Sequence, residues 1–266
     1  MIKLFQVDAF TDTLFKGNPA GVCILEKMES DQWMLLLARE MNLSETAFLV
    51  RQDNDFYLKW FTPKKEVLLC GHATLASAHV LWEEKIVSYQ DNITFLTKSG
   101  KLSARKDHQI IRMDFPSRIV MNTDQNEKLN QFLKVKPLYT GKYGTNSGDI
   151  FLLEVESDEI VKNLKPDFQG LLSTQVRSVI VTSKSSDPKY DFVSRYFAPA
   201  VGVNEDPVTG SAHCCLAPYW GEKLGKKGMV GYQASERSGI VLCTWNNDRV
   251  ILGGTAVTVF KIRVLL

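Results

Sequence analysis

The chain has 266 residues, and its 32 Lys plus Arg against 30 Asp plus Glu give a formal net charge of +2. With 44% hydrophobic and 23% charged residues, this is the composition of a folded globular protein, which excludes a disordered or fibrous chain. The near balance of charges predicts no nucleic-acid partner. No apolar run approaches the roughly 18 residues of a membrane-spanning helix, and no signal-peptide core is present, so we expect a cytoplasmic protein without a membrane partner.

Five cysteines make an odd count, and two of them are adjacent: Cys23, Cys70, Cys214, Cys215 and Cys243. No Cys-x-x-Cys pair and no pair of histidines at metal-ligand spacing accompanies them. We therefore expect buried, reduced thiols, and neither a metal site nor a disulfide framework.

The first half of the chain mixes strand and helix patterns. Ser30 or Asp31 is expected to cap a helix that runs through Met41, and a second helix, rich in small residues, is expected from Gly71 to about residue 84. Strand patterns occupy residues 1–10, 22–25, 44–50, 56–61, 93–95, 102–105 and 110–115.

In the second half, the polar segment 122–130 is predicted to be a linker. Strands are predicted at 152–155, 179–182, 191–197 and repeatedly from 229 onward. A helix of small residues begins at Gly210, and Pro218 is expected to kink or end it. Because strands and helices do not alternate steadily, the sequence favours an α+β fold with lobes 1–121 and 122–266, the last strand being able to pair with the first lobe.

One motif occurs twice. Lys59-Trp60-Phe61-Thr62-Pro63 recurs as Arg195-Tyr196-Phe197-Ala198-Pro199, and each copy is followed by a glycine that opens a helix of small residues. The motifs are 136 residues apart and the glycines, Gly71 and Gly210, are 139 apart. This offset is far longer than the period of a solenoid repeat, so two related lobes are predicted.

The two helix openings are candidate anion sites. The first turn of a helix has N–H groups without intrahelical partners, and a glycine there lets a ligand approach the backbone. The alternative is that the glycines only allow close packing. His72 at one opening, and Asp206 and Ser211 at the other, favour the binding interpretation, because helix capping would explain only one of these polar residues.

Glu45 lies where the first helix has ended and a strand begins, in an otherwise apolar stretch. The carboxylate is either exposed on a loop or turned into a partly dry cavity, where its pKa would rise as a proton-transferring group requires. Spacing alone favours exposure.

Several segments in the same order resemble the PhzF-like phenazine-biosynthesis isomerase family, which shares the fold of diaminopimelate epimerase. They are Val7-Asp8-Ala9-Phe10, Gly17-Asn18-Pro19-Ala20-Gly21, Asn42-Leu43-Ser44-Glu45-Thr46-Ala47-Phe48, Leu69-Cys70-Gly71-His72-Ala73-Thr74, Phe197-Ala198-Pro199, Glu205-Asp206-Pro207-Val208-Thr209-Gly210-Ser211-Ala212-His213 and Gln233-Ala234-Ser235-Glu236-Arg237-Ser238-Gly239. The match runs from residue 7 to about residue 240.

The resemblance implies two lobes, each with a mixed sheet curled around a central helix, and an active site between them. It also implies a homodimer and a reaction without a metal or an organic cofactor. By this analogy the protein moves a proton on a small carboxylate-bearing substrate by acid/base catalysis. The residues implied are Glu45, His72 and Asp206 as catalytic groups, and Asn18, Gly71, Gly210 and Ser211 as substrate-binding groups. Loops around 143–147 are expected to select the substrate.

Two alternatives stay open. A cofactor-free amino-acid epimerase would need a thiol at each helix opening, whereas Cys70 at the first is matched by Thr209 at the second. A protein that binds small carboxylates without turnover would keep the same scaffold and is not distinguished by the sequence.

Overall fold

The computed structural model describes residues 2–145 and 148–265, and the chain forms two compact units. The first comprises residues 1–115 and 251–266, and the second comprises 116–250. Thus the chain divides at 115/116, where the sequence suggested 121/122, and it returns to the first unit within strand β17 (Arg249–Gly254). No helix in the described part is long and apolar enough to cross a bilayer.

The first unit is a mixed sheet with two helices. Its elements are β1 (Lys3–Ala9), β2 (Asn18–Leu25), α1 (Asp31–Met41), β3 (Glu45–Gln52), β4 (Asp55–Phe61), β5 (Glu66–Val67), α2 (Gly71–Glu83), β6 (Ile93–Thr97), β7 (Gly100–Asp107), β8 (Ile110–Pro116) and β18 (Ala256–Arg263). The strands pair in the order β18-β1-β2-β3-β4-β6-β7-β8, with β5 on β4. Only β2–β3 and β4–β6 are parallel among these pairs.

The second unit repeats this topology. Its elements are β9 (Met121–Asn122), α3 (Glu127–Leu133), β10 (Tyr139–Thr145), β11 (Gly148–Glu154), α4 (Asp158–Lys162), α5 (Phe168–Ser173), β12 (Ser178–Lys184), β13 (Phe192–Ala198), β14 (Val203–Asp206), α6 (Gly210–Leu224), β15 (Gly228–Gln233) and β16 (Gly239–Asn246). The order is β9-β10-β11-β12-β13-β15-β16 with β14 on β13, and β11–β12 and β13–β15 are parallel.

The strand register explains why the repeated motif recurs after 136 residues and the helix glycine after 139. Phe61 pairs with Glu66, and the equivalent Phe197 pairs with Glu205. The connection in the second unit is longer because a 3₁₀ turn of three residues, Pro199–Val201, lies between β13 and β14. The motif predicted from the sequence is therefore a repeat of the whole strand order.

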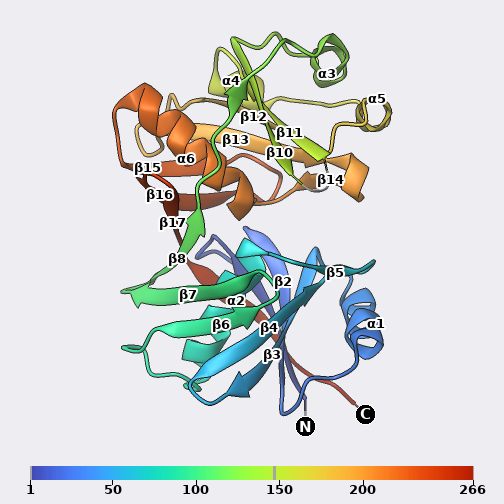
Figure 1. Ribbon diagram of the computed structural model, residues 1–266, viewed down its shortest axis with the longest axis vertical. Coiled ribbons are helices and arrows are strands. Elements are labelled where there is room, and N and C mark those ends of the chain that lie inside the picture. Colours follow the sequence, from blue (N-terminus) through green and yellow to red (C-terminus); the bar gives the residue numbers. More distant parts are fainter. Residues whose placement is uncertain (1, 146–147, 266) are drawn as a thin grey trace. The chain divides into compact units, whose positions relative to one another are not determined.

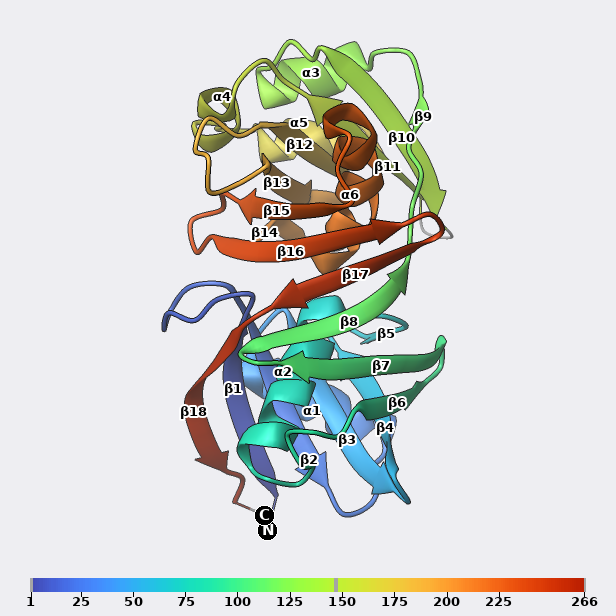
Figure 2. The same ribbon diagram turned by 90° about the vertical axis from the view of Figure 1, so that its left-hand side faces the viewer.

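Each unit is built around one central helix, α2 in the first and α6 in the second (Figures 1 and 2). Nearly all of α2 is buried, and α6 is buried from Ala212 to Pro218. A helix that is buried all round must carry small side chains where it meets the sheet, which accounts for the run of Ala, Ser, Thr and Gly in both helices. The two predicted helix starts, Gly71 and Gly210, are correct.

Pro218 does not end its helix, contrary to one of the two expected outcomes, since α6 continues to Leu224. In a regular helix the N–H of residue 218 would donate to the carbonyl of Cys214, and proline has no such N–H. The backbone N–H of Arg118 donates to this carbonyl instead, over 2.9 Å. A neighbouring segment thus satisfies the group that the proline leaves without a partner.

The segment 122–130 is not a linker. Asn122 ends β9, and Asn126 caps α3 by accepting a hydrogen bond from the N–H of Leu129. Leu129 and Leu133 of α3 join the apolar core of the second unit. The polar residues of this segment are the cap and the outer face of a short helix, a pattern too brief for periodicity to detect.

Candidate functional site

Glu45 is the first residue of β3 and lies a short turn, residues 42–44, after the end of α1. Helix α1 begins at the cap formed by Ser30, one of the two predicted candidates, and ends at Asn42, whose φ of 49° turns the chain into the strand. In the parallel pair β2–β3, Glu45 lies beside Ala20. Its side chain is only 19% exposed, so the expectation of exposure from spacing alone is wrong.

The first turn of α2 places His72 against this carboxylate. His72 Nε2 lies 3.3 Å from Glu45 Oε2, and on the other side of the ring Nδ1 lies 3.5 Å from Cys70 Sγ. Burial disfavours the charged form and lowers the pKa of His72 to about 3. The imidazole is therefore neutral at any physiological pH.

A neutral imidazole has one N–H donor and one acceptor nitrogen. Nδ1 is within hydrogen-bond distance of the Cys70 thiol. Nε2 lies 3.3 Å from Glu45 Oε2 but is buried and makes no hydrogen bond in this structure. The carboxylate and the neutral imidazole are therefore close neighbours that are not joined by a hydrogen bond.

Asn18 begins β2 and is fully buried. It precedes Ala20 by two residues, so its side chain leaves the sheet on the same face as that of Glu45. The preceding Gly17 has a φ of +64°, and a Cβ there would lie 2.2 Å from the carbonyl oxygen of Ala9. Only glycine fits this turn, which fixes where Asn18 enters the strand.

In the second unit, Asp206 is the last residue of β14 and lies just before α6. Its carboxylate Oδ2 accepts a hydrogen bond from the hydroxyl of Thr209, the N-cap residue of α6. Gln233 fixes this arrangement: its Nε2 donates to the Asp206 carbonyl over 2.7 Å, and its Oε1 accepts from the Thr209 N–H over 2.8 Å. The Asp206 backbone and the helix start are thereby tied to β15.

Gln233 is a site residue that the chemical reasoning from sequence missed. It is fully buried, and it also donates to the Thr209 hydroxyl over 3.2 Å. Its one sequence signal was that it begins the last segment of the family resemblance. Nothing about a lone glutamine indicates that it will meet a strand end and a helix start.

The helix starts of the two units correspond residue by residue. Cys70 and Thr209 are the N-cap residues, and neither side chain makes a capping hydrogen bond. The next positions are Gly71 and Gly210, and then His72 and Ser211. His72 is buried, whereas Ser211 is exposed. The second start thus has a hydroxyl N-cap where a two-thiol epimerase needs its second thiol.

The strand position of Glu45 has a different residue in the second unit. Thr46 pairs with Phe61 in the first unit and Val179 with Phe197 in the second, which makes Ser178 the counterpart of Glu45. Ser178 is buried and accepts a hydrogen bond from the Tyr196 hydroxyl over 2.7 Å. At this position a carboxylate able to move a proton is present only in the first unit.

Among the predicted site residues, the structure brings Glu45 and His72 together at the start of α2, which Gly71 opens. Asp206, Gly210 and Ser211 gather in the second unit around the start of α6. Of the loop 143–147 that was expected to select the substrate, residues 146–147 lie outside the described residues.

Within the described part of the chain, one group of three side chains has the donor types of a metal site. The donor atoms of Glu45, Cys70 and His72 lie within 4.8 Å of one another. However, Cys70 faces one ring nitrogen of His72 and Glu45 faces the other. A metal would need both to meet it beside the same nitrogen, so this arrangement does not fit a metal site.

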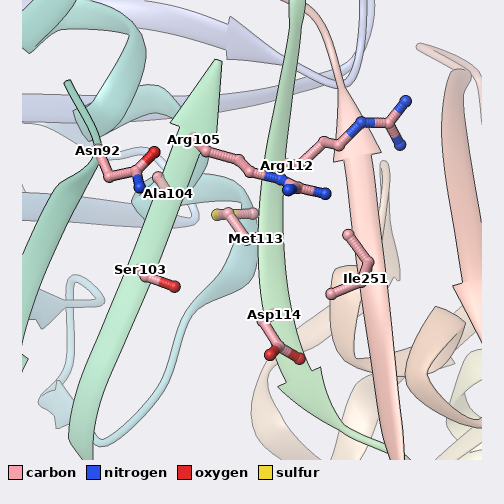
Figure 3. Close-up of a pocket in the computed structure, with 8 residues that line it drawn as sticks. All are labelled: Asn92, Ser103, Ala104, Arg105, Arg112, Met113, Asp114 and Ile251. Carbon is pink, nitrogen blue, oxygen red and sulfur yellow. The ribbon is translucent and has the colours of Figure 1, made fainter. Parts of the chain in front are cut away.

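A separate cavity of about 80 Å³ lies on β7 and β8 and contains none of the predicted site residues (Figure 3). Arg105 and Arg112 line it and stand directly opposite each other across the two strands. Arg112 Nε lies 3.1 Å from Asp107 Oδ2. No acid/base pair is present in this lining, and it is not a candidate catalytic site.

The mixed sheets and central helices define a two-unit α+β protein, and its first unit holds a largely buried carboxylate beside an imidazole. The family described as phenazine biosynthesis-like protein matches residues 7–262. The chain therefore belongs to the phenazine biosynthesis-like (PhzF) family.

Relatives support this membership. An uncharacterized isomerase from Halalkalibacterium halodurans is 52% identical over 265 residues, which cover 99% of this chain and 98% of that protein. The crystal structure of a PhzF-family phenazine biosynthesis protein from Enterococcus faecalis is 39% identical, with a TM-score of 0.92 over 100% of this chain and 99% of that one.

The fold extends to more distant proteins. A hydroxyproline epimerase from Agrobacterium vitis is 9% identical and has a TM-score of 0.64 over 98% of this chain and 91% of that one. At this identity the likeness concerns the fold alone, and it confirms the epimerase-like α+β architecture expected from the sequence.

Proposed function

We propose that the protein is a cofactor-independent isomerase that moves a proton on a small carboxylate-bearing substrate, with Glu45 as the acid/base group. The observation that supports this most is the pair formed by Glu45 and His72. A largely buried carboxylate lies 3.3 Å from an imidazole that burial keeps neutral. Beside an imidazole that stays neutral, the carboxylate is the group of the pair that takes up and releases the proton.

In the proposed reaction, Glu45 removes a proton from a carbon next to a carbonyl or unsaturated group and returns it to another carbon of the same substrate. His72 donates a hydrogen bond to the carboxylate before the transfer and accepts one from the protonated acid afterwards. This change of tautomer keeps Glu45 oriented in both states. Its neighbour Cys70 can follow the change, because a thiol both donates and accepts.

The substrate carboxylate is assigned to the helix starts. Neither Cys70 nor Thr209 caps its helix with a side chain, and N–H groups of a first turn attract anions. In this proposal Gly71, Gly210 and the Ser211 hydroxyl bind the carboxylate, and Asn18 binds a further polar group. Asp206, held by Gln233, assists as a second acid/base group.

The relatives' names agree with this reaction class, since the protein from Halalkalibacterium halodurans is named an isomerase. We further propose the homodimer in the cytoplasm that the sequence resemblance implies. The assembly is tested by the molar mass of the purified protein in solution.

The reaction is tested by solvent-deuterium incorporation. The protein is incubated in D₂O with a panel of small unsaturated carboxylates, and deuterium at carbon is measured by mass spectrometry. Glu45→Gln should slow incorporation by a factor of about 10² or more, which is the ordinary size of a general acid/base contribution. Glu66→Gln is the matched control, because Glu66 lies in the same unit and pairs with Lys98.

An undiminished rate in the Glu45→Gln variant would remove Glu45 from the role. Tight binding of a carboxylate by the wild type without any deuterium incorporation would instead support a binding protein on the same scaffold.

A further inference from the structure

Trp60, in β4, has a buried hydrogen-bond donor without an acceptor. The side chain is 1% exposed, and its indole Nε1 is buried with no hydrogen-bond partner among the described residues. By contrast, the indole of Trp82 donates to the Asp91 carbonyl over 3.3 Å, and that of Trp220 donates to the Thr182 hydroxyl over 3.0 Å. Burying an N–H group without an acceptor destabilises the folded protein, so the donor of Trp60 needs an explanation.

The strand register places this donor close to Glu45. Trp60 pairs with Ala47 across the antiparallel strands β3 and β4. Glu45 precedes Ala47 by two residues, so its side chain leaves the sheet on the same face as the indole, at the diagonal position. Long and aromatic side chains at diagonal positions are within reach of each other. A Glu45 carboxylate that turns toward β4 therefore meets the indole N–H.

The equivalent residues of the second unit make this same contact. The repeated motif makes Tyr196 the counterpart of Trp60, as Ser178 is the counterpart of Glu45. Tyr196 pairs with Ile180, so Ser178 occupies the same diagonal position, and the Tyr196 hydroxyl donates to Ser178 Oγ over 2.7 Å. An indole N–H lies nearer its backbone than a tyrosine hydroxyl does, and the longer glutamate makes up the difference. The repeat thus has a donor on the fourth strand and an acceptor on the third in both units.

We propose that Trp60 is a positioning residue for Glu45, whose ionised carboxylate turns toward β4 and accepts a hydrogen bond from the indole N–H. The inference rests on the proposed role of Glu45 as the acid/base group. In the structure Glu45 Oε2 lies 3.3 Å from His72 Nε2, and within the described chain neither this nitrogen nor Trp60 Nε1 has a hydrogen-bond partner. The carboxylate thus has one buried polar neighbour on α2 and another on β4. Because an isomerase moves a proton between two atoms of its substrate, a carboxylate that turns between two fixed neighbours suits this reaction.

The direct test is an NMR titration of the ¹⁵N-labelled protein with pH, in which each tryptophan gives one indole N–H resonance. The Trp60 resonance, assigned with Trp60→Phe, should move downfield as the pH rises and Glu45 ionises. In Glu45→Gln this movement should be lost, because the amide does not titrate. The Trp82 resonance is the internal control, since this indole lies in the same unit and donates to the Asp91 carbonyl. A Trp60 resonance that stays fixed over the pH range in which the protein is folded, or that moves equally in Glu45→Gln, would overturn the proposal.

The second test is the pH dependence of deuterium incorporation. A hydrogen bond to the carboxylate stabilises its ionised form, so Trp60→Phe, which keeps an aromatic ring but has no N–H, should raise the pKa of Glu45. The pH of half-maximal rate should rise by about one unit, and Trp82→Phe should leave it unchanged. Partial unfolding lowers the rate at every pH without moving this midpoint, and an unchanged midpoint in folded Trp60→Phe would also overturn the proposal. The NMR titration needs no substrate, so its result and that of the Glu45→Gln deuterium experiment can fail separately.

Discussion

The ion pair between Arg195 and Glu205 holds β13 to β14, the strand that ends at Asp206. Arg195 Nε donates to Glu205 Oε1 over 2.6 Å, and Nη2 donates to Oε2 over 2.8 Å. A third nitrogen, Nη1, donates to the Leu164 carbonyl over 2.8 Å. The two side chains are only 11% and 19% exposed, so water cannot easily replace the carboxylate.

Glu205→Gln keeps the shape of the side chain but removes its charge. The amide oxygen can retain one of the two hydrogen bonds, while the amide NH₂ faces an N–H of the guanidinium. Removing one partner of a fully buried ion pair costs about 3–5 kcal/mol. Since Glu205 is 19% exposed and Leu164 still accepts from Arg195, we expect a loss of about 2–4 kcal/mol in the free energy of unfolding.

Thermal unfolding followed by circular dichroism tests this, and the midpoint should fall by roughly 5–15 °C. Glu66→Gln is the matched control, because Glu66 occupies the equivalent strand position and its partner Lys98 is 52% exposed. This control should change the midpoint little. Equal shifts for Glu205→Gln and Glu66→Gln would refute the reasoning that burial makes the first pair important.

Three further changes test other parts of the structure. Gly17→Ala should lower the free energy of unfolding, measured in urea, by about 1–3 kcal/mol, because φ is +64° and the new Cβ would lie 2.2 Å from the Ala9 carbonyl oxygen. A loss below about 0.5 kcal/mol would contradict this. Burial lowers the pKa of His213 to about 4, so between pH 6.5 and 4 the unfolded chain binds a proton that the folded protein does not. The free energy of unfolding therefore falls as the pH decreases through this range. His213→Gln should therefore flatten the fall of the thermal midpoint between pH 6.5 and 4, and an unchanged fall would count against this cause. Gln233→Leu should lower the free energy of unfolding by about 1–3 kcal/mol and speed hydrogen exchange at the Thr209 amide, because the buried N–H loses its acceptor. Unchanged exchange at Thr209 would contradict the role of Gln233 in fixing the start of α6.

Local signals in the sequence were sufficient for the main framework. Ser30 and Asn42 bound α1 because a capping hydroxyl and a residue that tolerates positive φ act within one turn. The starts at Gly71 and Gly210 were found because small residues mark a helix that must be buried on all sides. The repeat could be predicted because the two copies of its five-residue motif, at 59–63 and 195–199, have the same kinds of residue in the same order.

Features that depend on distant contacts were missed. Pro218 looked like a helix breaker, since nothing local indicates that the Arg118 N–H will occupy the Cys214 carbonyl. The direction of the Glu45 side chain is set by the parallel pairing of β2 with β3 and by the position of α2, and spacing along β3 cannot show either. The hydrogen bonds of Gln233 likewise join β15 to the end of β14 and the start of α6, and no local pattern in the sequence indicates this contact.

The proposed function depends on carboxylate binding at the helix starts that Gly71 and Gly210 open. NMR titration of the ¹⁵N-labelled protein with a carboxylate that undergoes deuterium incorporation tests this binding most directly. We predict that the amide resonances of Gly71, Gly210 and Ser211 shift on titration, while the control residue Gly225, at the far end of α6, does not respond. Unchanged amide resonances at Gly71 and Gly210 would contradict the proposal.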